Sequence, residues 1–175
     1  MASFNFPLGV SQNDPNFHRI RQIIAGFRGY ETLGDLKAAD DQVRNQIAAQ
    51  LDKAAGEAAG ARKAIEAGMH LLVLPDFDRM VEHIHASRDR LQDRYRSRIL
   101  ACHAYQPQRE LIRQIYELDF RILTDAENVY NLMQEFVRMA REDMMLSNIY
   151  KIDVSLREIA AALEKKGEVI GCMIV

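Results

Sequence analysis

The chain has 175 residues, of which 48% are hydrophobic and 27% charged, and its formal net charge is -2 at pH 7. This balance is typical of an ordinary globular protein, and it argues against a disordered chain and against a basic nucleic-acid-binding protein. A chain of this length suits one domain with a substantial core, so we expect a single domain over residues 1–175.

The cysteine content bears on the cellular compartment. Cys102 and Cys172 lie far apart, and the chain does not open with a charged segment followed by an apolar one. This pattern is typical of free thiols in a reducing cytosol, so we expect a cytoplasmic protein. Apolar runs such as Leu71 to Leu74 are far shorter than the roughly 20 residues that span a bilayer, so we expect no transmembrane helix.

Apolar residues recur at three- and four-residue steps through most of the chain, which is the spacing of amphipathic helices. Between Met69 and Lys166 there is no glycine, and Pro75 and Pro107 are the two prolines of that stretch. We therefore predict an elongated, antiparallel all-α bundle with a coiled-coil-like core. The predicted helices are three long ones, at about 35–67, 76–104 and 108–145, and two short ones, near 15–28 and 154–166.

Capping residues indicate where these helices begin and end. Asp14 followed by Pro15 is a typical helix start, whereas Gly68 and Gly167 are expected to end helices. Thr124 has the spacing of a capping box with the glutamate three residues on, so the helix over 108–145 could be broken there; the continuous apolar periodicity favours an unbroken helix. The chain ends are predicted to be an extended arm (1–13) and an apolar tail (168–175).

Small residues gather in the second half of the helix at 35–67, where Gly56 and Gly60 stand among alanines. Glycine inside a helix costs roughly 0.5–1 kcal/mol relative to alanine. We therefore expect either a close approach of another helix at these positions or a soft point, meaning a place where the helix tolerates the lower stability that glycine causes.

Gly29-Tyr30, Lys37-Ala38-Ala39-Asp40 and Val43-Arg44 resemble the opening of a group of small bacterial all-helical proteins without an assigned activity. The resemblance covers about the first third of the chain. It implies no activity and no functional residue.

One helix face suggests a metal site. Glu82 and His85 have the Glu-x-x-His spacing of di-iron helical bundles, because side chains three residues apart reach a common ion. Such a centre needs further carboxylates, for which Glu117 or Glu127 are candidates, and no second Glu-x-x-His occurs. A solvated acidic face with a lone histidine explains the same residues, so a transition-metal protein using Glu82 and His85 is the alternative rather than the main prediction.

The sequence offers little for catalysis. His103 directly follows Cys102, and adjacent helical residues point about 100° apart, so this histidine is badly placed to activate the thiol. We predict no catalytic residue and no cofactor-binding residue, and we do not expect an enzyme.

The main prediction is a non-enzymatic interaction protein that acts through helix faces and terminal arms as an adaptor, an assembly factor or a structural subunit. We expect it to bind another protein and to self-associate into a homo-oligomer, without nucleic acid as a partner. Attachment to a membrane surface through the terminal arms is a further alternative. The residues predicted to make these contacts are Phe4, Phe6, Met139, Met144, Met145 and Ile174.

Overall fold

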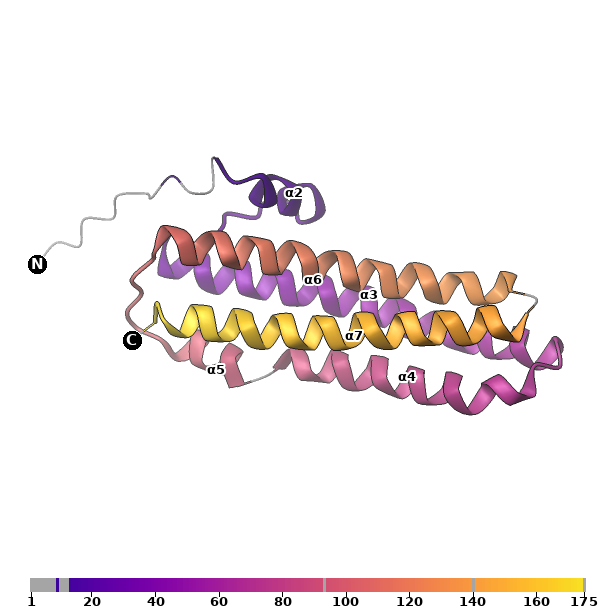
Figure 1. Ribbon diagram of the computed structural model, residues 1–175. Coiled ribbons are helices and arrows are strands. Elements are labelled where there is room, and N and C mark those ends of the chain that lie inside the picture. Colours follow the sequence, from indigo (N-terminus) through magenta and orange to yellow (C-terminus); the bar gives the residue numbers. More distant parts are fainter. Residues whose placement is uncertain (1–8, 10–12, 93, 140, 175) are drawn as a thin grey trace, which may run out of the picture. The chain divides into compact units, whose positions relative to one another are not determined.

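The computed structural model describes residues 9, 13–92, 94–139 and 141–174, and this part of the chain is a bundle of long and short α-helices (Figure 1). The predicted all-α fold is thereby confirmed. The predicted arm at 1–13, with Phe4 and Phe6, lies almost entirely outside the described residues. The helices are α2 (Pro15–Ile23), α3 (Leu33–Ala67), α4 (Leu74–Asp89), α5 (Arg94–Ala101), α6 (Arg109–Glu135) and α7 (Glu142–Gly171).

Packing divides the chain into two compact units, each assembled from separate stretches of sequence. Unit 1 comprises Met1–Gln46, Gln92–Ile122 and Ala162–Val175, and unit 2 comprises Ile47–Leu91 and Leu123–Ala161. Helices α3, α6 and α7 each contribute residues to both units. The prediction of a single domain stays a prediction.

Unit 2 is built from four helical segments whose order follows from contacts between neighbours. Helices α3 and α4 are antiparallel, α4 and α7 are parallel, and α7 returns antiparallel to α6 (Figure 1). Inside the bundle the Phe77 and Phe136 rings meet edge to face, with centroids 5.2 Å apart. The neighbour contacts are Arg62–Asp78 (α3–α4), His83–Asp153 (α4–α7), Asn148–Glu135 (α7–α6) and Lys53–Tyr130 (α6–α3).

Unit 1 encloses an aromatic cluster that ties the short helix α2 to α6. The Phe17 ring lies 5.4 Å from that of Tyr116 and 5.8 Å from that of Phe27, measured between centroids. At the start of α2, the Asp14 carboxylate accepts hydrogen bonds from the backbone amides of Asn16 and Phe17, as predicted for a helix cap. The cluster therefore holds α2 through burial as well as through its cap.

The C-terminal end of α5 is fixed to α3 within unit 1. Lys37 donates hydrogen bonds of 3.0 Å to the carbonyl oxygens of both Leu100 and Cys102. An ammonium group at a helix C-terminus satisfies carbonyls that have no helical partner and complements the helix dipole. The helix ends at Ala101, short of the predicted boundary at residue 104.

The long helix predicted at 76–104 is interrupted. Helix α4 ends at Asp89, a short 3₁₀ turn (η2, Arg90–Gln92) follows, and α5 begins at Arg94. The apolar stripe that would hold one continuous helix against the core runs through Ile84 and Leu91, but the turn between them carries the exposed Arg88. Without burial at that turn, the continuous helix loses the packing that stabilises most protein helices.

The predicted boundaries of the last two helices are also wrong. Helix α6 passes unbroken through Thr124, as expected, but it ends at Glu135, and a 3₁₀ turn (η3, Phe136–Arg138) follows. Helix α7 begins already at Glu142, well before the predicted residue 154. No glycine or proline marks this break. The fully buried Phe136 and the Asn148–Glu135 hydrogen bond fix it through tertiary packing.

Helix α7 also continues past Gly167 to Gly171, so Gly167 does not terminate it and the first half of the predicted tail, residues 168–171, is helical. Val169, Ile170 and Met173 are all buried and extend the apolar stripe beyond the glycine. Burial of these side chains outweighs a helix-interior glycine, which costs roughly 0.5–1 kcal/mol.

The two glycines in the middle of α3 can be assigned as soft points. Gly56 and Gly60 are exposed, and a Cβ atom added at either position would meet nothing within 4 Å. The inward-facing small residues are instead Ala54, Ala58 and Ala61. The glycines therefore make no room for a neighbouring helix.

We predict that Gly56→Ala and Gly60→Ala each stabilise the protein by about 0.5–1 kcal/mol, because alanine removes backbone entropy from the unfolded chain without a clash. Urea unfolding followed by circular dichroism measures the change. Ala59→Gly, at an exposed position of the same helix, is the matched control and should destabilise by a similar amount. Loss of stability in either alanine variant would contradict the assignment.

Candidate functional site

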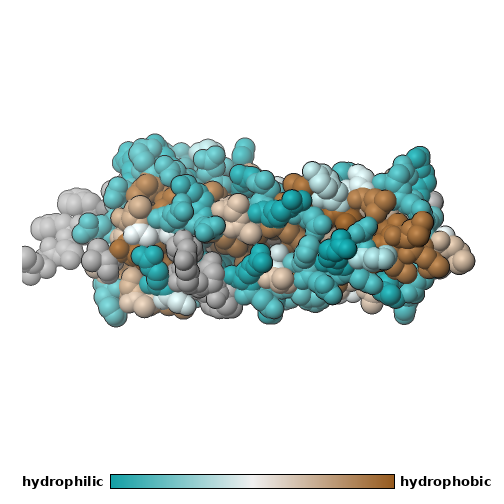
Figure 2. All heavy atoms as spheres, turned by 60° about the horizontal axis from the view of Figure 1, so that its bottom comes forward, coloured by the Kyte–Doolittle hydropathy of each residue, from teal (hydrophilic) through white to brown (hydrophobic). Residues whose placement is uncertain are grey.

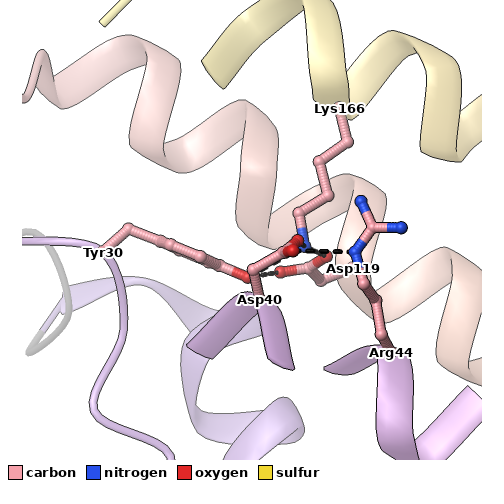
Figure 3. A network of polar contacts seen from close by, with 5 residues as sticks. All are labelled: Tyr30, Asp40, Arg44, Asp119 and Lys166. Carbon is pink, nitrogen blue, oxygen red and sulfur yellow. Dashed lines mark hydrogen bonds and ion pairs between the residues drawn. The ribbon is translucent and has the colours of Figure 1, made fainter. Parts of the chain in front are cut away.

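Unit 1 contains a network of buried charged side chains that come from three helices (Figure 3). Lys166 of α7 is 1% exposed and Asp119 of α6 is 0% exposed. Asp40 and Arg44 of α3 are buried beside them, and Tyr30, just before α3, completes the group. Charged groups are almost never buried to this extent unless they are paired.

The Lys166 ammonium group lies at the centre of this network. Its Nζ is 2.7 Å from Asp119 Oδ1 and 3.0 Å from Asp40 Oδ1, and it donates a 3.1 Å hydrogen bond to the Tyr30 hydroxyl. The Tyr30 hydroxyl in turn donates to Asp119 Oδ2, and Arg44 Nε donates to Asp40 Oδ2 over 2.7 Å. Two cations and two carboxylates are thus paired within one buried layer.

Burial and pairing shift the acidities in different directions. Burial raises the pKa of Asp119, although Lys166 and Tyr30 oppose this effect. Burial acts in the same way on Asp40, but there Lys166 and Arg44 outweigh it and lower the pKa. Burial favours neutral Lys166, yet the carboxylates of Asp119 and Asp40 outweigh that effect and raise its pKa. The ammonium form of Lys166 is therefore the stable form in the folded protein.

Sequence reasoning did not single out this network, although the signal for it is present. Its charged members from α3 and α6 stand where an apolar residue is expected on an inward-facing stripe: Asp40 lies between Leu36 and Val43, and Asp119 lies between Ile115 and Ile122. Lys166 follows Leu163 at the same three-residue step. Charged residues at core positions of three different helices indicate a shared buried layer, because each needs a partner.

The second notable site is the turn between α3 and α4 in unit 2. The backbone amide of Met69 donates to the Glu66 carbonyl and that of His70 to the Ile65 carbonyl, each over 3.0 Å. These two bonds form a Schellman motif in which Met69 takes the left-handed position that glycine usually occupies. Among the described residues, Met69 is the non-glycine residue with a positive φ, at 60°.

The glycine that precedes Met69 serves a different purpose. A Cβ atom at Gly68 would lie 2.7 Å from Cδ2 of the His70 ring, which is closer than real Cβ atoms approach other atoms. The His70 ring is itself held beside α7, with Nδ1 3.5 Å from Glu142 Oε1. Gly68 thus leaves room for the close approach of the ring, and the left-handed conformation falls at Met69. This conformation costs a non-glycine residue about 1–2 kcal/mol.

The same turn exposes large apolar side chains. Met69 is 75% exposed, Leu72 83% and Leu71 51%. Figure 2 shows hydrophobic residues gathered over this α3–α4 connection, at the right of the view. We call Met69, Leu71 and Leu72 the apolar turn. Strained backbone and exposed apolar side chains at one place are typical of a binding site rather than of a stability element.

The predicted metal ligands Glu82 and His85 both lie exposed on α4. Among the residues that the structure describes, no group of three or more His, Cys, Asp or Glu side chains is arranged to hold a metal ion. Metal binding by Glu82 and His85 therefore stays a prediction.

The predicted interaction residues are distributed between surface and core. Met144 is exposed and Met139 is half-buried, but Met145 is buried in the core of unit 2. Ile174 is half-buried and pairs with Tyr105 in an isolated antiparallel bridge, and the amide of Gln106 donates to the Met173 carbonyl over 2.7 Å. The described end of the tail thus packs onto unit 1.

Comparison with known proteins found no matching protein family, no similar curated protein and no similar solved structure. Within the described part of the chain, none of the helices is both long enough and apolar enough to cross a membrane.

We predict that Lys166→Met destabilises unit 1 by about 3–5 kcal/mol, because two buried carboxylates lose their shared counter-ion. The variant Lys166→Met with Asp119→Asn should recover much of this loss, since it removes the carboxylate that is left without a counter-ion, whereas Asp40 keeps Arg44. Unfolding free energies from urea titration test both expectations.

The loss in Lys166→Met should depend on pH. Without the ammonium group, the effect that opposes burial is lost, so the pKa of Asp119 rises further. A carboxyl group whose pKa is raised in the folded state lowers the stability of the protein as pH rises toward that pKa. The destabilisation should therefore be larger at pH 8 than at pH 5. A cost that is independent of pH would argue against ionised carboxylates in the network.

We predict that Met69→Gly stabilises the protein by about 1 kcal/mol, because glycine adopts the left-handed conformation without steric cost. Thermal and urea unfolding measure the change. Leu72→Gly is the matched control: it places glycine in the neighbouring 3₁₀ turn (η1, Leu71–Val73), outside the left-handed position, and should destabilise. A destabilised Met69→Gly would show that the methionine side chain contributes more than its backbone strain costs.

Proposed function

We propose that this chain is a non-enzymatic interaction protein, an adaptor, assembly factor or structural subunit, which binds a partner protein through the apolar turn between α3 and α4. The observation that carries the proposal is the combination at Met69, where a left-handed φ of 60° accompanies a side chain that is 75% exposed. Glycine at this position would remove the strain and the exposed side chain together. The presence of methionine here is therefore best explained by a contact that its side chain makes.

The energetics of the apolar turn fit a specific but reversible contact. Burying a large apolar side chain contributes about 1.5–3 kcal/mol, so Met69, Leu71 and Leu72 together supply on the order of 5 kcal/mol or more. Part of that is offset by the entropy cost of association. The turn is thus a local anchor, and additional helix surface around it would complete a stable interface.

Exposed residues on α7 are available for that additional contact. Met144, Leu146 and Tyr150 are all large, apolar and exposed, and the α3–α4 turn is joined to the start of α7 by the His70–Glu142 pair. We propose that the partner presents an apolar groove that receives the turn. A second copy of this chain and a different protein both satisfy this requirement, in line with the expected self-association.

Site-specific photo-crosslinking in the native host tests the proposal. A photoreactive phenylalanine analogue placed at Leu72 should give a discrete crosslinked protein, identified by mass spectrometry. The matched control places the same analogue at Ala59, which is exposed on α3 of the same unit. Recovery of this same chain at position 72 would identify self-association, which light scattering on the purified protein then checks independently.

A second variant separates binding from folding. Leu71→Ser with Leu72→Ser should remove the partner while the helical circular dichroism and the thermal midpoint stay close to those of the parent, because both side chains are largely exposed. Met69→Gly should weaken binding although it stabilises the fold. Equal crosslinking at positions 59 and 72, or none at 72, would show that the apolar turn is not the interaction site.

A further inference from the structure

An open pocket of about 530 Å³ lies between α4 and α7 of unit 2. This volume falls within the range of sites that hold small molecules. Its chemistry differs from that of the apolar turn, because three of its polar lining residues are arginines. The lining residues are Arg79, His83, Ala86, Ser87, Arg90, Asp153, Leu156, Arg157 and Ala160.

The hollow follows from the residues at which the two parallel helices meet. His70 lies 3.5 Å from Glu142 at the start of the pair, and His83 Nδ1 lies 3.0 Å from Asp153 Oδ1 further along. Beyond that second contact, the lining includes the small residues Ala86 and Ser87 on α4 and Ala160 on α7. Small side chains on both helices leave space that leucine or isoleucine would fill in an ordinary bundle.

Three guanidinium groups and one carboxylate line the pocket, so its charge is positive even with a neutral histidine. The Asp153 carboxylate is already engaged by His83, and Arg157 Nε donates a 3.2 Å hydrogen bond to the Asp153 carbonyl oxygen. Arg79 makes a 3.0 Å ion pair with Asp76, but both side chains are well exposed, so water and ligands compete readily for it. No ion pair to Arg90 is found among the described residues.

The three arginines lie at two different positions along the length of the pocket. At 1.5 Å per residue, Arg79 and Arg90 are separated by roughly 16 Å along the chain of α4 and η2, and Arg157 lies about one turn beyond Asp153 on the opposite helix. Arg90 and Arg157 therefore lie toward the same end, beyond the His83–Asp153 pair. The apolar part of the lining, formed by Ala86, Leu156 and Ala160, lies alongside them.

We propose that this pocket binds a small organic phosphate. Arg90 and Arg157 would hold the phosphate oxygens through paired N–H donors, which match phosphate geometry better than an ammonium group does. A phosphate monoester carries about -1.5 to -2 charge at neutral pH, close to the excess positive charge of the pocket. The organic part of the ligand lies against Ala86, Leu156 and Ala160. This site is independent of the apolar turn and does not rest on the proposed interaction.

Calorimetric titration of the full chain with phenyl phosphate tests the proposal, with inorganic phosphate and phenol as the comparison ligands. We expect saturable binding of phenyl phosphate in the millimolar range or tighter, weaker binding of inorganic phosphate, and no binding of phenol. Binding should weaken as ionic strength rises, because charged groups carry it. Absence of phenyl phosphate binding at low salt would overturn the proposal.

Substitutions then locate the site. Arg90→Gln and Arg157→Gln should each weaken phenyl phosphate binding at least about tenfold, and Arg90→Lys should fall between, because it keeps the charge but loses the paired donors. Arg138→Gln, at an exposed arginine of unit 2 outside the pocket, is the matched control and should leave binding unchanged. Thermal midpoints of all variants confirm that they remain folded.

Amide chemical shifts complete the test. Addition of phenyl phosphate to the labelled protein should shift amides within 79–90 and 153–160. A free phosphate ester and a phosphorylated lipid headgroup share this chemistry, and vesicles containing phosphatidic acid distinguish the two sources. Binding that the pocket variants leave unchanged, or shifts confined to other residues, would assign the phosphate to a different site and overturn the proposal.

Discussion

Lys166 is buried only because carboxylates from two other helices meet its ammonium group. Removing an ion from water costs several kcal/mol even after the protein relaxes, so the lysine tolerates no arrangement in which Asp119 and Asp40 lie elsewhere. A slip of α7 by one turn would displace its Nζ by about 5.4 Å, leaving Lys166 and Asp119 without their ionic partners and Asp40 with Arg44 alone. The network therefore selects one register of α3, α6 and α7 within unit 1. Through the Tyr30 hydroxyl it also fixes the segment that leads into α3.

Unit 2 reaches its structure by a different route. The buried charged side chains that the structure describes all belong to unit 1, whereas the buried polar residues of unit 2 are the uncharged Asn148 and Ser155. Its charged contacts, such as Arg62–Asp78, lie at the surface, where ion pairs contribute little. Shape and apolar packing, as at Phe77 and Phe136, must therefore determine the register of unit 2.

The sequence predicted what depends on local periodicity and missed what depends on contacts between distant segments. Helix α3 was predicted to within two residues of its start, because its apolar stripe and Gly68 are local signals. The break after Glu135 was missed, since Phe136 and Asn148 produce it by packing, and α7 ran through Gly167 because buried residues follow it. Of the candidate site, Gly68 was recognised as a helix stop. The left-handed Met69 was not, because glycine usually marks that position and methionine stands there instead.

Small residues in this protein have different consequences at different places: at some they affect only helix stability, and at others they leave a hollow. Side-chain size alone does not determine which of the two occurs. In α3, Gly56 and Gly60 face solvent, so their lack of side chains alters only the stability of the helix itself. Between α4 and α7, Ala86, Ser87 and Ala160 leave a hollow, because the His83–Asp153 pair and the surrounding arginines occupy the interface and do not fill it. A helix approaches closely over small residues only when its other contacts permit it. In unit 2, longer polar side chains border the small ones, and the space that remains is lined by positive charge.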